Sequence, residues 1–167
     1  MTTESQIQEL IELADELFND AQRCADAKLW RAAVISAGGA VEAGLIATLA
    51  RMEQPASARQ PRHRDLLRLT LGQAAHEAIS AGLLPTAHLE RITDPLKSLE
   101  GEAGDAMSFL TATRNMLVHP GNYVTSDARP DLTNSAHMQT VYEVLRAITL
   151  VVFDHLTAAL QPAAAVI

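Results

Sequence analysis

The chain has 167 residues, of which 48% are hydrophobic, 20% charged and 4% aromatic, with a formal net charge of −7. This length and hydrophobic fraction are typical of one globular domain with a substantial core. The single cysteine, Cys24, excludes an internal disulfide and fits the reducing cytoplasm, and the acidic balance argues against a surface that attracts nucleic acid as a whole. The few aromatic residues likewise argue against binding single strands by base stacking.

The first predicted element is an amphipathic helix that begins after Thr3. Thr3 and Gln6 have the spacing of a capping box, in which two side chains satisfy free N–H groups at a helix start. Apolar residues then recur at helical spacing as far as Ala21, with acidic residues on the opposite face. Because this N-terminus is acidic and amphipathic, we do not expect a signal peptide.

The second predicted helix spans Lys28 to Met52 and is apolar on nearly all sides. A membrane span requires about 20 apolar residues, so this helix meets the length criterion. We reject that interpretation because Glu42 lies at its centre, where an acid costs about 3 kcal/mol in a bilayer. Three glycines lower its hydrophobicity further and are expected to let a neighbour's backbone come close. The sequence therefore predicts the buried central helix of a bundle, and no membrane association.

The rest of the chain shows further helical patterns and no alternating strand pattern. Gly82 is a suitable residue just after a helix end, and Pro95 is a suitable first helical residue. The remaining helices are predicted at Asp65–Ala81, Thr86–Thr93, Pro95–Glu100, Asp105–His119 and Ala136–Ala159, with long loops at 53–63 and 120–136. The sequence thus predicts one all-α domain over residues 1–160 and a flexible C-terminal tail at 161–167.

Three chemically capable side chains meet at the end of the helix that precedes Pro120. Asn115 and His119 are four residues apart and therefore share a helix face. Arg114 offers a planar fork for a phosphate, and His119 can exchange a proton near neutral pH. A guanidinium, an amide and an imidazole at one exposed helix end suit phosphodiester chemistry without a metal.

The segment Arg114-Asn115-x-x-x-His119 resembles the signature of the HEPN superfamily, in which a polar residue follows an arginine and a histidine follows a few residues later. The Ala-rich helix around Glu42 resembles a helix that precedes this motif in many HEPN-like proteins. The resemblance implies a four- to five-helix up-and-down bundle that pairs as a homodimer. It also implies a metal-independent endoribonuclease, related to toxin–antitoxin systems or phage defence, with RNA as substrate and a cognate antitoxin or other partner protein.

Within that resemblance, Arg114, Asn115 and His119 are the expected catalytic residues. His119 would act as general base or acid, Arg114 would stabilise charge on the phosphate, and Asn115 would orient His119 or bind the phosphate. Glu42 is expected to pair with Arg114, although a surface position or another basic partner would also satisfy it. The loop after the motif offers Asn122 and Tyr123 as further support.

RNA contact is expected near residues 51–68, which contain five arginines against Glu53 and Asp65. The candidates are Arg59, Arg62 and Arg64, and the alternative is a solvated loop whose arginines only aid solubility. The histidines do not have metal-ligand spacing, so we expect neither a metal nor another cofactor.

The second functional hypothesis is an inactive helical interaction module of the same fold. An arginine and a histidine at a helix C-terminus complement the helix dipole, which alone could explain Arg114 and His119. The acidic surface and the scarce aromatic residues favour this alternative.

Overall fold

The computed structural model describes residues 3–53, 66–99, 106–119 and 131–160, and all regular structure within them is helical. The predicted all-α bundle is therefore confirmed. Its elements are α1 (Glu4–Asp26), α2 (Trp30–Glu53), the 3-10 helix η1 (Leu66–Arg68), α3 (Leu71–Ser80), α4 (Thr86–Thr93), the 3-10 helix η2 (Asp94–Ser98), α5 (Ala106–Val118) and α7 (Ser135–Leu160).

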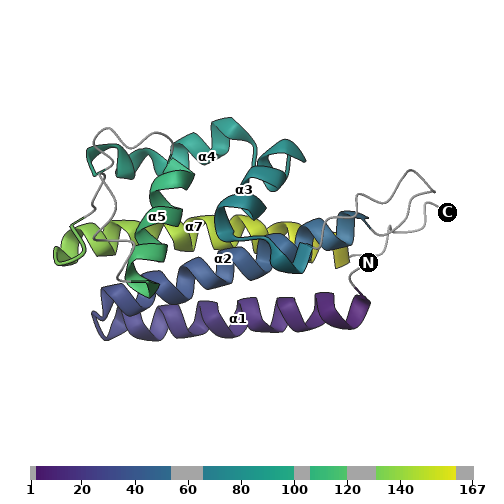
Figure 1. The fold of residues 1–167 in the computed structure, drawn as a ribbon, viewed down its shortest axis with the longest axis horizontal. Helices are drawn as coiled ribbons and strands as arrows, with labels where there is room; N and C mark the ends of the chain where they lie inside the picture. The colour runs from purple at the N-terminus through teal and green to yellow at the C-terminus, as the bar shows by residue number, and fades with distance from the viewer. Residues whose placement is uncertain (1–2, 54–65, 100–105, 120–130, 161–167) are drawn as a thin grey trace.

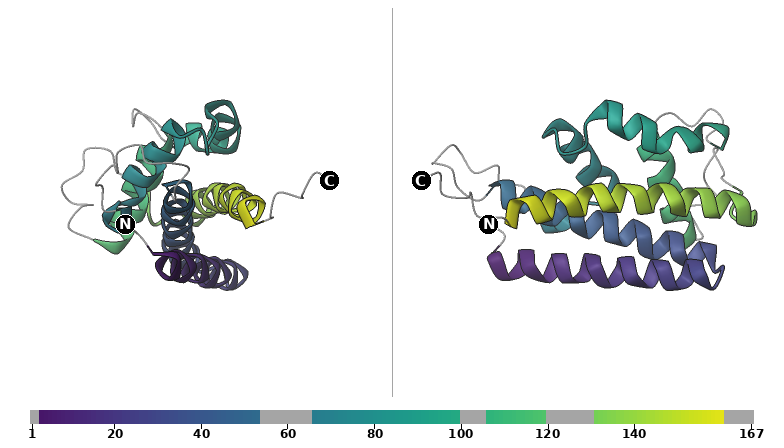
Figure 2. Two further views of the ribbon diagram at one scale, coloured as in Figure 1. Left: turned by 90° about the vertical axis from the view of Figure 1, so that its right-hand side faces the viewer. Right: turned by 180° about the vertical axis from the view of Figure 1, so that it is seen from behind.

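Three long helices form the body of the bundle, and shorter helices cover one side of it. Helices α2 and α7 lie between α1 on one side and α3, α4 and α5 on the other (Figures 1 and 2). Helices α3 and α5 pack on α2, and α4 packs on α7. Helix α5 crosses the direction of the long helices (Figure 1), so that the end of α5 reaches the first half of α2.

The long helices do not all alternate in direction. Helix α1 runs antiparallel to α2, as the contact between Glu4 and Arg51 at 3.8 Å shows. Helix α7 runs parallel to α2, because Trp30 lies beside Tyr142 at one end and Arg51 donates to the carbonyl of Leu156 at the other. The predicted up-and-down order thus holds for α1 and α2 but not for α7, because α3, α4 and α5 return the chain between α2 and α7 (Figure 1).

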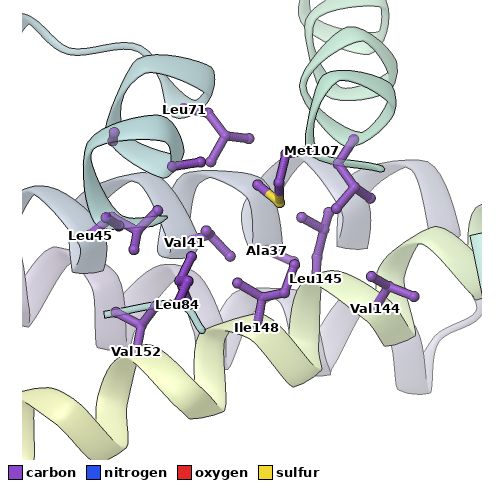
Figure 3. Close-up of a cluster of buried hydrophobic side chains, with 14 of the residues drawn as sticks. Ala37, Val41, Leu45, Leu71, Leu84, Met107, Val144, Leu145, Ile148 and Val152 are labelled. Carbon is purple, nitrogen blue, oxygen red and sulfur yellow. The ribbon is translucent and has the colours of Figure 1, made fainter. Parts of the chain in front are cut away.

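Helix α2 is the central and mostly buried helix that the sequence predicts. Residues Trp30–Met52 are long and apolar enough to cross a membrane, and 72% of their most apolar window is buried inside the bundle. In Figure 3 its side chains meet those of α7 and of the shorter helices, and the labelled residues include Ala37, Val41, Leu45, Leu145, Ile148 and Val152. Neighbouring protein atoms therefore cover most of the apolar surface of α2.

Several helix ends differ by a few residues from the predicted ones. Helix α2 begins at Trp30 and not at Lys28, because Lys28 adopts a positive φ of 59° in the turn after α1. The helix predicted at Asp65–Ala81 is divided, since Thr70 is extended and starts α3 as its N-cap, with the side chain of Gln73 accepting from the Thr70 N–H at 3.0 Å. The segment predicted from Pro95 to Glu100 is the 3-10 helix η2.

Other local signals in the sequence are confirmed. Thr3 and Gln6 form the capping box of α1. Gly82 has a φ of 76°, a conformation that suits glycine at a helix C-terminus. The predicted loop at 53–63 and the tail at 161–167 lie, except for Glu53, outside the described residues, as does most of the loop at 120–136.

Tyr142 provides a prediction on pH dependence. Its side chain is buried beside Trp30, with ring centroids 6.1 Å apart, and burial raises its pKa above the ordinary value of 10.0. The neutral phenol therefore contributes stability that is complete below the unfolded pKa and is lost as pH rises through the folded pKa. In a Tyr123→Phe chain, which keeps Tyr142 as the only tyrosine, absorbance titration of the phenolate should give a midpoint above 10. A midpoint at or below 10 would contradict this burial.

Candidate active site at the end of helix α5

Arg114 links the end of α5 to the middle of α2. Its Nη2 atom lies 3.5 Å from Oε2 of Glu42, and its Nη1 atom donates a hydrogen bond to Oδ1 of Asn115 at 3.2 Å. The side chains of Arg114 and Glu42 are 24% and 25% exposed, so the pair is half-buried and still reaches solvent. The predicted pairing of Glu42 with Arg114 is therefore confirmed.

The ion pair leaves polar atoms of both residues without a hydrogen bond. Oε2 of Glu42 and Nε of Arg114 are buried, and neither has a hydrogen-bond partner in the part of the chain that the structure describes. The contact at 3.5 Å is thus an ion pair without a well-aligned hydrogen bond. A buried polar group without a partner carries a desolvation cost, so the guanidinium retains unused hydrogen-bonding capacity at this position.

His119 lies one residue beyond the last residue of α5. Its backbone N–H donates to the carbonyl of Asn115 at 2.8 Å, so the backbone still follows the final turn, and its side chain is exposed. On helical geometry Arg114 lies about 7.5 Å back along the axis and about 140° round from His119, whereas Asn115 lies only about 40° round. Asn115 therefore lies between the two groups, sharing a face with His119 and bonded to Arg114.

Among the described residues, no hydrogen bond joins the imidazole of His119 to another side chain. The imidazole of His119 is exposed, and Oδ1 of Asn115 accepts from Arg114. The site thus offers one cation, one amide and one exposed imidazole at a single helix end.

Other residues predicted for the site lie outside the described residues. These are Arg59, Arg62 and Arg64 for RNA contact, and Asn122 and Tyr123 for support. Arg51 belongs to the same arginine-rich segment, lies within the residues that the structure describes, and has a structural role. Its side chain is 13% exposed, bonds the Leu156 carbonyl at 3.4 Å and faces Glu4, so it ties α2 to α7 and α1. It also lies about 14 Å further along α2 than Glu42, the ionic partner of Arg114.

Gly38 also belongs to the site, although the sequence predicted only that the glycines of α2 pack closely against a neighbour. The three glycines of α2 were expected to admit a neighbour's backbone, but side chains of three different helices are nearest to them: Arg114 of α5 at Gly38, Leu17 of α1 at Gly39 and Val152 of α7 at Gly44. The signal was the Gly-Gly pair inside a long helix, which marks close packing without saying what packs there.

A hollow of about 330 Å³ lies away from this site, at the N-terminal ends of α2 and α7, where Lys28, Trp30, Arg31 and Thr133 are among its lining residues. Arg114 is not among its lining residues. Within the described parts of the chain, no group of three or more His, Cys, Asp or Glu residues is placed to hold a metal ion.

Comparisons of the chain with models of protein families, with curated proteins and with solved structures find no match. The class that the fold defines is an all-α helical bundle.

Proposed function

We propose that this chain is a metal-independent endoribonuclease of the HEPN type that acts as a homodimer. The observation that supports the proposal most strongly is the position of Arg114, whose guanidinium lies between Glu42 and Asn115 in the last turns of the helix that ends just before the exposed His119. A guanidinium has five N–H donors. Of these, Nη1 donates one N–H to Asn115, and Nη2 lies 3.5 Å from Glu42 as an ion pair and not as a hydrogen bond. The remaining terminal N–H groups are proposed to bind the oxygens of a phosphate.

The proposed reaction uses the ribose 2′-OH of RNA as the nucleophile. One His119 takes the 2′-OH proton as the oxygen attacks the adjacent phosphorus, and Arg114 stabilises the charge that develops on the phosphate oxygens. The bond to the 5′-oxygen breaks, and a second imidazole supplies the proton to that leaving oxygen. The products are a 2′,3′-cyclic phosphate and a free 5′-OH. Since one chain has one His119, the second imidazole requires a second copy of the chain.

The proposed setting is the cytoplasm, in a toxin–antitoxin or phage-defence system where a cognate partner protein holds the nuclease in check. This part of the proposal is supported by the resemblance of Arg114-Asn115-x-x-x-His119 to the HEPN motif. The net charge of −7 means that RNA must be attracted locally, which Arg59, Arg62 and Arg64 would help to do.

The test compares the parent chain with His119→Ala and with His76→Ala on labelled RNA in the presence of a chelator. His76 is a matched control, because it is also an exposed histidine, and it lies on α3. General acid–base groups typically contribute 10²–10⁴-fold, so cleavage should fall by about that factor in His119→Ala and stay at the parent rate in His76→Ala. If the cleavage rate falls in neither variant, or falls equally in both, His119 is not the proton-transfer group.

The second candidate is an inactive helical interaction module, and one observation favours it. Arg114 connects α5 to α2 through Glu42, which is a structural task that needs no chemistry. If the parent chain leaves RNA intact while removal of Arg114 lowers the stability of the bundle, the module is the better account.

A further inference from the structure

The aliphatic part of Arg114 crosses α2 directly over Gly38. A Cβ atom built on Gly38 would lie 2.8 Å from Cγ of Arg114, 3.5 Å from its Cβ and 3.8 Å from its Cδ. Real Cβ atoms essentially never come within 3.0 Å of another heavy atom. Gly38 therefore provides the space through which the side chain reaches its guanidinium position.

The same face of α2 provides both this space and the ionic partner of the arginine. Glu42 follows Gly38 by four residues, so the two lie one above the other on the helix. The side chain of Arg114 thus passes over Gly38 before its Nη2 comes within 3.5 Å of Glu42. A methyl group at position 38 would meet the root of the side chain and not its flexible end, so either α5 must shift or Arg114 must adopt another rotamer.

The neighbouring glycine provides a comparison within the same helix. A Cβ on Gly39 would lie 3.0 Å from Cδ1 of Leu17, a terminal methyl on α1 that can move by rotation of the leucine side chain. Glycine is also the least favourable helix residue after proline, so an alanine at either position gains helix propensity. The two positions differ mainly in whether Arg114 is displaced.

We propose that Gly38 is a positioning residue for Arg114, fixing where the guanidinium lies relative to Glu42, Asn115 and a bound phosphate. This inference rests on the proposed ribonuclease function for its effect on activity, but not for its effect on the position of Arg114. A displacement of about 1 Å in a group that binds the transition state can cost about 10²-fold in rate. Gly38→Ala is therefore expected to lower kcat with little change in KM.

The activity test compares Gly38→Ala with Gly39→Ala on the same labelled RNA. We expect kcat to fall by about 10²-fold in Gly38→Ala and to remain within about twofold of the parent in Gly39→Ala, where the proposed phosphate-binding groups stay in place. Equal rates in the two variants would overturn the inference.

A stability test addresses the same inference when no RNA is cleaved. Arg114→Ala removes the Cγ atom that a methyl at position 38 would strike, so it should lower Tm in the parent and raise Tm in the Gly38→Ala background. If Gly38→Ala alone does not fold, the double variant should fold. If Arg114→Ala lowers Tm equally in both backgrounds, Gly38 does not position Arg114. A further result would be a parent chain that cleaves no RNA while Arg114→Ala still lowers Tm in the parent and raises it in Gly38→Ala. That result would refute the proposed ribonuclease function and retain the positioning role of Gly38.

Discussion

Arg114→Ala is expected to reduce RNA cleavage by about 10²–10³-fold, the usual loss when one group that stabilises developing charge is removed. Alanine removes the cation that contacts Glu42 and Asn115. Arg114→Lys should restore only part of the rate, because an ammonium keeps the charge and loses the planar fork that binds two phosphate oxygens. Single-turnover cleavage of labelled RNA in chelator measures both effects.

Arg91→Ala is the control for the loss of a positive charge, because Arg91 is an exposed arginine on α4. That variant should cleave RNA at the parent rate. Arg114→Ala should also lower the free energy of unfolding, by about 1 kcal/mol or less for a partly exposed pair. A rate in Arg114→Ala equal to that of Arg91→Ala would remove the guanidinium from the proposed mechanism.

Leu145→Ala is expected to destabilise the bundle by about 2–5 kcal/mol, the range for truncation of a fully buried leucine. Leu145 is 0% exposed and lies in the cluster between α2 and α7 (Figure 3). A loss of this size lowers Tm by about 2–4 °C for each kcal/mol in a chain of this length. Urea denaturation followed by circular dichroism measures the change in unfolding free energy.

Leu150→Ala is the matched control on the same helix, because Leu150 is 41% exposed. Truncation of a surface leucine should change the unfolding free energy by about 0.5 kcal/mol or less. Similar losses for the two leucines would mean that α7 does not face α2 as the structure shows.

The local chemistry of the sequence was sufficient to predict most of the helices. Thr3 and Gln6 satisfy the first N–H groups of α1, and the helical spacing of apolar residues extends through α7. The pairing of Glu42 with Arg114 was expected because a carboxylate in an apolar helix needs a partner, although a surface position or another base would also have satisfied it.

The arrangement of the helices was harder to predict from the sequence, for a physical reason. Helix α2 is apolar on nearly every side, so its sequence does not indicate which neighbour covers which face. The parallel direction of α7 depends on how α3, α4 and α5 return the chain, which no local pattern shows. The structural role of Arg51 was hidden for a similar reason, because an arginine beside a basic loop looks like part of that loop until its contacts with Leu156 and Glu4 are known.

The chemical groups at the ends of the RNA fragments are the most specific product of the proposed reaction. Incubation of the purified chain with RNA in chelator should give fragments that end in 2′,3′-cyclic phosphate and begin with 5′-OH, and His119→Ala should give none. Intact RNA under these conditions, or fragments with 5′-phosphate and 3′-OH ends, would contradict attack by the 2′-OH at the Arg114–His119 site.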